Sequence, residues 1–248
     1  MKGTSFNKPF EWNIETKGET WHQGAFIEGI LNVKNHGTEK ISLLNSGVAL
    51  AYAEIKKVHA RSEGVFRPEV SQSFEKVELL PAETLELNFK LKLPENCPVS
   101  DKKASYYLIY GRDFLESNLQ MRVDPLPLFG KVIGLLDTFH RFKLKEYKTT
   151  KNGVEYKLLP PTSREMANVD SLAIVFALKD EQLLVNYEFQ VKKIDTTTSM
   201  NKIVKASIKS SRSLAPKEYS LGRDMINQDQ LLKSIQSVLD EVKLNNIF

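Results

Sequence analysis

Thr84-Leu-Glu-Leu-Asn-Phe-Lys-Leu-Lys-Leu93 is the stretch that decides the fold class of this chain. Leucine or phenylalanine occupies every second position, and polar residues occupy the positions between them. Because successive side chains of a β-strand point to opposite faces, this alternation predicts a strand with one face on a core and one in water. Pro81, Pro94 and Pro98 mark turns on both sides. Half-exposed antiparallel strands of this kind are typical of a β-sandwich.

Further short strands, separated by turn residues, are expected in the first half of the sequence. They are placed at 6–15, 24–33, 70–80, 84–93 and 104–111, with one bent strand or two short ones at 41–58. Such a series of short strands predicts a sandwich. The alternation pauses near residues 111–117, so we expect a domain boundary there and an N-terminal β-sandwich over residues 1–114.

The second half, residues 115–248, combines strands with two helices. We expect strands at 118–123, 141–149, 153–159, 171–178, 183–191 and near 202–211. Asp124-Pro-Leu-Pro127 favours the start of a short amphipathic helix that ends near Thr138. The predicted fold is therefore mainly β, with two consecutive antiparallel β-sandwich domains.

The chain is expected to close with a helix. Asn227 and Gln230 resemble a capping box, and apolar residues follow at helical spacing. The pattern favours a helix that docks on the second sandwich, and a dimerisation or partner helix is the alternative. Self-association is therefore left open.

Composition and charge narrow the functional class. Hydrophobic residues make up 41% of the 248 residues, which predicts packed cores rather than disorder. The formal net charge of +4 is far below that of a dedicated nucleic-acid-binding protein. Cys97 is the one cysteine, which excludes an internal disulfide and favours a reducing compartment. The amino terminus lacks an apolar signal segment, so we expect a cytoplasmic protein.

No catalytic residue, metal site or cofactor is expected. A zinc site needs three or four closely placed donors, whereas the histidines stand far apart in the sequence. They are His22, His36, His59 and His140. Cys97 lies in a loop between two prolines, and no neighbouring base is evident. An enzyme whose site is assembled from distant residues remains an alternative.

The loop Arg61-Ser-Glu-Gly-Val-Phe-Arg-Pro68 is one candidate partner-binding site. Phe66, beside Val65, would form an apolar tip between the charges of Arg61 and Arg67. The alternative is that Phe66 folds back onto the sheet, because single apolar loop residues are ordinary.

Basic residues of the strand expected near 202–211 form a second candidate. Lys202, Lys205, Lys209 and Arg212 lie on or beside this strand, with Lys205 and Lys209 on the face opposite Val204, Ala206 and Ile208. Lysines on an exposed edge strand commonly protect against aggregation. The alternatives are an anionic protein partner or an anionic membrane surface. Nucleic acid is not expected, since no aromatic residue interleaves with the basic ones.

The first half resembles the arrestin-like superfamily, and specifically its bacterial sporulation-control branch. Gly24, Ile27 and Gly29 fit an amino-terminal signature of arrestin domains, while Gln23 and Ala25 depart from its proline and glutamate. Three further elements follow in the family's order. They are Leu80-Pro81-Ala82-Glu83, Pro94-Glu95 with Pro98-Val99-Ser100, and the tyrosine-rich stretch Tyr106-Tyr-Leu-Ile-Tyr110.

The second half resembles the same branch in its strand, proline-containing break, short apolar helix and aromatic-led strand. These features run from Met121 to Leu144. The resemblance implies two β-sandwiches joined by a short connection. It also implies a non-catalytic adaptor or regulator that binds other proteins through loops at the sandwich ends and through unpaired edge strands.

Overall fold

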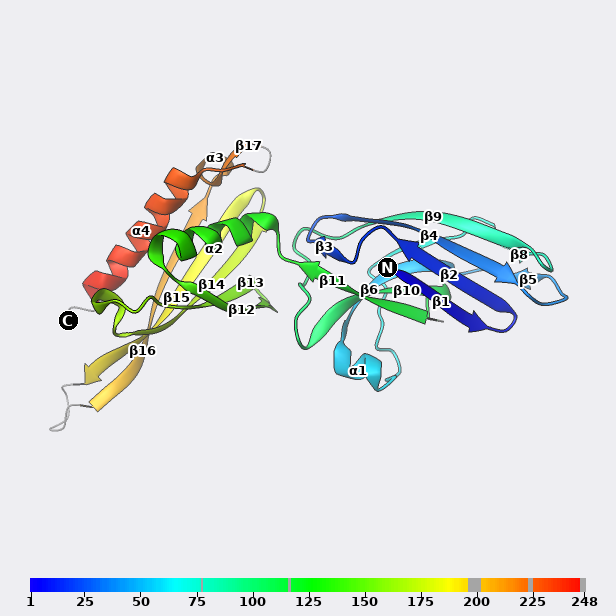
Figure 1. Cartoon of the computed structure of the whole chain (residues 1–248), viewed down its shortest axis with the longest axis horizontal. Helices are drawn as coiled ribbons and strands as arrows, with labels where there is room; N and C mark the ends of the chain where they lie inside the picture. The colour runs from blue at the N-terminus through cyan, green and yellow to red at the C-terminus, as the bar shows by residue number, and fades with distance from the viewer. Residues whose placement is uncertain (77, 116, 196–201, 223–224, 246–248) are drawn as a thin grey trace. The chain divides into compact units, whose positions relative to one another are not determined.

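A computed structural model describes residues 1–76, 78–115, 117–195, 202–222 and 225–245 (Figure 1). The chain divides into two compact units, Met1–Asp124 and Pro125–Phe248. The division lies ten residues beyond the expected boundary at 114/115. The reason is that β11 (Ser117–Asp124) pairs with β10 (Ala104–Arg112) and therefore belongs to the first unit.

The first sheet of the first unit contains the stretch that decided the fold class. Its order is β1 (Lys2–Asn7), β2 (Phe10–Thr16), β4 (Phe26–Asn35) and β9 (Thr84–Lys92), and all of its pairs are antiparallel. On β9, Phe89 and Leu91 are buried while Glu86 and Lys90 are exposed, as the alternation predicted. The expected single strand at 6–15 is a hairpin instead, since β1 and β2 are separated by a turn at Lys8 and Pro9.

Gly29 allows β4 and β9 to pack closely. It lies opposite Phe89 in the register of the two strands. A Cβ atom at residue 29 would lie 2.6 Å from the Phe89 ring and 2.3 Å from the carbonyl oxygen of Glu15. Only glycine fits this position without a shift of backbone, which gives this residue of the arrestin-like signature a packing role.

The second sheet faces the first across an apolar core. Its order is β3 (Thr20–His22), β11, β10, β6 (Ser46–Glu54) and β7 (Val70–Ser73), with β3 and β11 parallel. Trp12, Leu31 and Phe89 from the first sheet join Leu50, Tyr106 and Leu108 from the second in one buried cluster. The first unit is therefore a β-sandwich, as predicted.

A second apolar cluster covers the outer face of β6 and β10. Tyr107 and Ile109 point to this side together with alanines of β6, and β10 is consequently buried on both faces. The cover comes from the segment that follows β6, which includes α1 (Ile55–His59). Part of the strand expected at 41–58 is therefore a helix. The short strands β5 (Ile41–Ser42) and β8 (Glu78–Leu79) pair beside the main sheets.

One edge of the sandwich is closed by a side chain. Gln72 on β7 donates its amide to the Asn88 carbonyl at 3.1 Å and accepts from the Lys90 N–H at 3.1 Å. The Gln72 amide thus hydrogen-bonds to main-chain groups on the outer side of β9. This strand is the last one of its sheet.

The second unit has one large antiparallel sheet. Its order is β12 (Lys143–Thr150), β13 (Gly153–Leu159), β14 (Val169–Lys179), β15 (Gln182–Asp195) and β16 (Lys202–Leu214). A 3-10 turn, Arg164–Met166, precedes β14. Between β16 and the last helix lie α3 (Pro216–Tyr219) and the small hairpin of β17 (Ser220–Gly222) and β18 (Met225–Ile226).

Two helices, rather than a second sheet, cover this sheet in the described residues (Figure 1). They are α2 (Pro127–His140) and α4 (Gln228–Asn245). Phe129 of α2 stacks on Phe176 of β14, with 5.2 Å between ring centroids. Both amphipathic helices were predicted; among the described residues, the layer that covers the large sheet consists of these helices and not of the expected second sheet. One apolar face needs one covering layer, and the two helical stripes supply it.

Substitutions on β9 test the predicted division into core and solvent faces. Phe89→Ala should lower the free energy of unfolding by about 3–5 kcal/mol, because the lost ring leaves a cavity. Lys90→Ala should cost less than about 1 kcal/mol, because its ion pair with Glu28 is exposed. Urea unfolding measures both. Equal losses in the two variants would contradict the assignment of faces.

Candidate interaction surfaces

Residues of the arrestin-like motifs meet at one end of the first unit. Gln23 is buried, and its side-chain amide donates a hydrogen bond to the carbonyl of Cys97. Its main-chain N–H donates to the Asp124 carbonyl at 3.1 Å, and the N–H of Gly24 donates to the Pro94 carbonyl at 3.2 Å. Gly24 has a positive φ of 76°, which favours glycine. Gln23, which departs from the family's proline, therefore supplies a hydrogen bond that proline cannot make.

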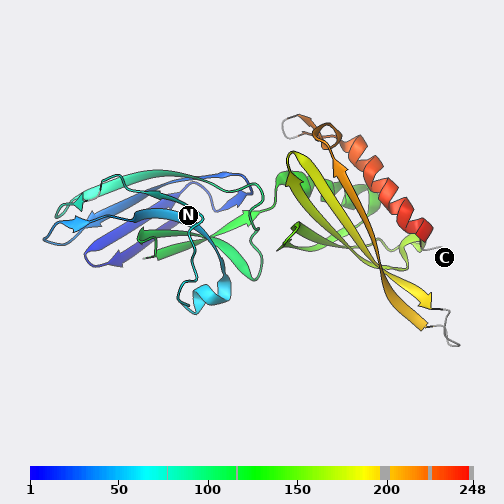
Figure 2. The same ribbon diagram turned by 180° about the vertical axis from the view of Figure 1, so that it is seen from behind.

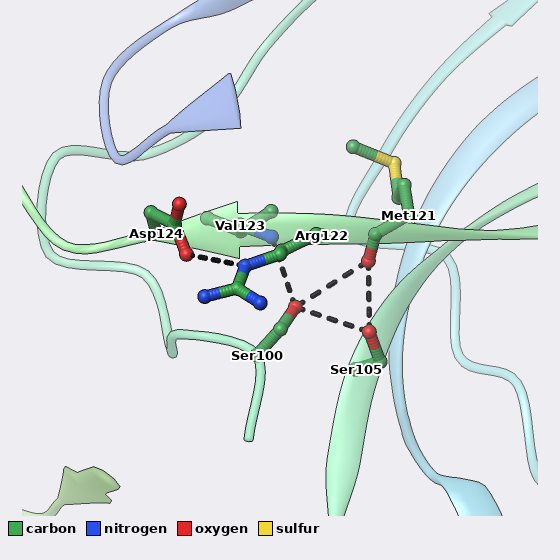
Figure 3. Close-up of polar contacts among 6 residues, drawn as sticks. All are labelled: Ser100, Ser105, Met121, Arg122, Val123 and Asp124. Carbon is green, nitrogen blue, oxygen red and sulfur yellow. Dashed lines mark hydrogen bonds and ion pairs between the residues drawn. The ribbon is translucent and has the colours of Figure 1, made fainter. Parts of the chain in front are cut away.

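Ser100, in the Pro-Val-Ser motif, ties the loop after β9 to β11 (Figure 3). Its N–H donates to the Val123 carbonyl at 2.8 Å, and its hydroxyl accepts from the Val123 N–H at 2.9 Å. The buried Ser105 donates to the Met121 carbonyl at 2.8 Å and lies 3.0 Å from the Ser100 hydroxyl. Both serines are thus engaged in holding β11 in place. We call Gln23, Ser100, Ser105 and the main chain of β11 the polar junction.

Cys97 is a buried thiol next to this junction. Tyr106 donates a hydrogen bond to a Glu69 carboxylate oxygen at 2.9 Å. The pKa of the Cys97 thiol is raised to about 11, chiefly by burial; the neighbouring Tyr106 hydroxyl acts in the opposite direction, and the negative charge of Glu69 adds to the increase. The thiolate is the nucleophilic form of cysteine, so this thiol stays protonated at neutral pH.

The four histidines lie on different elements. His22 ends β3, His36 follows β4 and contacts Glu11, and His59 ends α1. His140 ends α2 and is partly buried, and burial with the nearby Lys243 lowers its pKa. Across the part of the chain that the structure describes, no three histidine, cysteine, aspartate or glutamate side chains are arranged to hold a metal ion.

The Arg61–Pro68 loop does not present Phe66 as an exposed tip. The Phe66 ring meets Tyr107 edge to face, with 5.3 Å between centroids. Phe66 and Val65 pack on the outer cluster of β6 and β10. Of the two alternatives, the structure has the one in which Phe66 folds back onto the sheet. Arg61 and Arg67 are exposed beside it.

The basic residues of β16 lie on two different faces. Lys205 and Lys209 are exposed on the face away from the helices, where Lys209 lies 3.9 Å from Glu188 of β15. Lys202 begins β16, and its side chain lies outside the described part. Arg212 points to the helix side and pairs with Glu241 of α4. The expected group of four basic residues is therefore divided, because side-chain direction alternates along the strand.

Arg212 is a fixed contact between sheet and helix. One guanidinium nitrogen donates to the Ser210 hydroxyl and to the Ser211 carbonyl, both at 2.9 Å. The other pairs with Glu241, which also accepts from Ser210 at 2.9 Å. These bonds pin the C-terminal helix α4 to the edge strand. The structure thus has the docked form of this helix.

Exposed leucines at the loops far from the polar junction were not predicted. Leu44 is 65% exposed and Leu80 is 53% exposed. Buried Asn35 holds these loops together, since its amide donates to the Glu39 carbonyl at 2.8 Å and the Leu79 carbonyl at 3.3 Å. The sequence signal for these exposed leucines was an apolar residue within a turn-forming stretch. A single apolar residue in a loop is ordinary and does not by itself predict a surface site.

The comparisons with known proteins show the fold. No protein-family model and no curated protein matches the sequence. Among solved structures, the chain is similar to Spo0M, a sporulation control protein from Bacillus subtilis, with a TM-score of 0.59. The match covers 95% of this chain and 99% of that one at 15% sequence identity. The predicted resemblance to the sporulation-control branch of arrestin-like proteins is confirmed at the level of the fold.

No described helix is sufficiently long and apolar to cross a lipid bilayer.

Removing Arg212 should loosen α4. Arg212→Ala is expected to lower the free energy of unfolding by about 1–2 kcal/mol, because Glu241 and the Ser210 hydroxyl lose a charged hydrogen-bond partner. Lys209→Ala is the matched control on the same strand and should change stability by less than about 0.5 kcal/mol. Urea unfolding gives the two values. A neutral Arg212→Ala variant would show that this contact does not hold the helix.

Proposed function

We propose that this chain is a regulatory adaptor that acts by binding other proteins and not by catalysis. The observation that carries the proposal is the similarity to Spo0M over nearly the whole length of both chains. Spo0M is a sporulation control protein. The similarity supports a regulatory role, and the binding of a protein partner is our inference.

The chemistry of the motif residues supports the same proposal. The Cys97 thiol is buried, and its raised pKa keeps it protonated at neutral pH. Ser100 and Ser105 bind main-chain groups of β11 and each other. Cysteine and serine side chains are the usual nucleophiles. Here the serine hydroxyls are engaged in the hydrogen bonds of the polar junction. An enzyme with a site assembled elsewhere remains the alternative that the experiment below tests.

Protein partners have two kinds of surface available. Arg61 and Arg67 flank the folded-back Phe66 and are exposed. Lys205 and Lys209 are exposed on β16, at the end of its sheet. An exposed sheet edge can take up an extended segment of a partner through main-chain hydrogen bonds. We therefore assign partner binding to this edge and to the loops.

The anionic-membrane alternative has less support from the surroundings of the lysines. Lys209 lies near Glu188, and Lys192 pairs with Asp170 at 2.7 Å on the same sheet. These carboxylates reduce the positive field that a membrane surface would require. The cytoplasmic location and self-association stay predictions.

Variants of the nucleophile and histidine positions separate an adaptor from an enzyme. Cys97→Ser and the single variants His22→Ala, His36→Ala, His59→Ala and His140→Ala should keep biological activity when they replace the native chain in its own cell. Partner binding, measured by cross-linking and affinity purification of the tagged full chain, should also persist. Circular dichroism confirms folding of each variant. A folded variant among these that has lost its activity would overturn the adaptor proposal.

A further inference from the structure

The strand β16 forms one margin of the sheet of the second unit (Figure 2). It pairs with β15 along its whole length, from Lys202 to Leu214. In the described ranges no strand lies on its other side. The margin of a sheet presents main-chain N–H and C=O groups that a further strand can bind.

The turn between β14 and β15 fixes which main-chain groups of β16 are free. Asp180 and Glu181 form a two-residue hairpin loop with φ of 48° and 60°, which places Lys179 opposite Gln182 in a hydrogen-bonded pair. Hydrogen-bonded and non-bonded pairs alternate along antiparallel strands. Even-numbered residues of β15 therefore bond toward β14, and odd-numbered ones bond toward β16.

The register between β15 and β16 determines which residues of β16, the last strand of the sheet, bond to β15. Val185 lies opposite Arg212 and Phe189 lies opposite Ile208, so even-numbered residues of β16 bond to β15. The N–H and C=O groups of Lys205, Ser207 and Lys209 consequently point away from the sheet. The Ser211 carbonyl, which belongs to the same odd-numbered series, accepts from Arg212 at 2.9 Å. This bond agrees with the alternation of hydrogen-bonding direction. Because it occupies the Ser211 carbonyl, the segment of β16 that is open to a further strand is limited to residues 205–209.

The side chains along the open segment determine which partner strand fits. Lys205, Ser207 and Lys209 point to the face away from the helices, and Ala206 and Ile208 point to the helix side, where they are half-buried. Lys209 is 72% exposed. Lys205 lies directly opposite Lys192, which pairs with Asp170 of β14.

We propose that the margin of β16 binds an extended protein segment in which acidic residues alternate with apolar ones. The main-chain groups of Lys205, Ser207 and Lys209 would bond the incoming strand. Acidic side chains opposite the two lysines would form favourable cross-strand pairs, and the apolar residues between them would extend the surface of Ala206 and Ile208. This inference rests on the proposed function and assigns its partner class.

A second copy of this chain fits the margin less well. If two β16 strands paired antiparallel about Ser207, Lys205 of one copy would lie opposite Lys209 of the other. Pairing centred on either lysine places that lysine opposite itself. Like charges directly opposite are destabilising, so these registers disfavour self-pairing while an acidic strand is favoured.

A peptide and a proline variant test the main-chain contact. The probe is an acetylated, amidated Glu-Val-Glu-Val-Glu-Val-Glu peptide carrying a fluorophore, titrated with the full chain. Ser207→Pro removes an N–H that faces away from β15, so the sheet should stay intact while peptide affinity falls at least about tenfold. Ser207→Ala is the matched control, because it also removes the hydroxyl bound to Glu188 but keeps the N–H. Circular dichroism and thermal unfolding confirm that both variants fold.

Charge reversal tests the acidic preference. The double variant Lys205→Glu with Lys209→Glu should bind the glutamate peptide at least about tenfold more weakly and should bind a Lys-Val-Lys-Val-Lys-Val-Lys peptide more tightly. Raising the salt concentration should weaken the native complex. Equal affinity of the native chain for both peptides would overturn the acidic preference.

The remaining outcomes separate this inference from its competitors. No binding of the glutamate peptide, or full binding by Ser207→Pro, would overturn strand addition at this margin. Binding to phosphatidylserine vesicles that is lost on charge reversal but kept in Ser207→Pro would assign the lysines to a membrane and overturn it too. Concentration-dependent dimers that Ser207→Pro dissociates would assign the margin to a second copy. A cellular partner that still cross-links to Ser207→Pro would leave the adaptor function standing while refuting this site.

Discussion

The alternation of side-chain direction along a strand is the constraint on which the rest of this structure depends. In the first unit it sends Phe89 and Leu91 into a core and leaves Lys90 in water. In the second unit it sends Phe176 toward the helices and Lys209 away from them. The same alternation governs the main chain, so that neighbouring residues of β16 bond to opposite sides. Core, surface and free margin follow from one geometrical rule.

The two units treat their sheet margins differently. In the first unit the side chain of Gln72 takes up the outer main-chain groups of β9. In the second unit Arg212 does this for the Ser211 carbonyl, and the segment before it carries exposed lysines instead. A covered margin contributes to stability, whereas a charged margin deters indiscriminate pairing and leaves room for a chosen partner. The proposed site is thus the part of the β16 margin that carries exposed lysines and precedes the Arg212 contact.

Much of the fold could be predicted from the sequence because local patterns specify local structure. The alternation in β9, β14 and β15 and the stripes of α2 and α4 predicted the mainly β class and both helices. What each element packs against is a non-local property. The apolar stripes of α2 and α4 do not show that these helices cover the sheet of their own unit. The second layer of this unit was therefore expected to be another sheet. The division into compact units at 124/125 differs from the expected boundary at 114/115 for the same reason, because the sequence of β10 or β11 alone does not show that the two strands pair.

The candidate site was predicted less completely than the fold. Lys205 and Lys209 were assigned to an exposed face, but Arg212 was grouped with them because its partner Glu241 lies far along the chain. Whether Phe66 folded back depended on Tyr107, which belongs to a different element. Electrostatic partners and loop packing are fixed by tertiary structure, and a linear pattern leaves them undetermined.

Backbone hydrogen exchange, followed by NMR on the full chain, tests most directly which amides of β16 bond to β15 and which face outward. The amides of Ala206, Ile208 and Ser210 bond to β15 and should exchange slowly, whereas those of Lys205, Ser207 and Lys209 should exchange rapidly. This alternation would be expected if the margin is free and its odd-numbered groups face outward. Uniform slow exchange across all six amides, or protection of the odd-numbered set, would contradict the account.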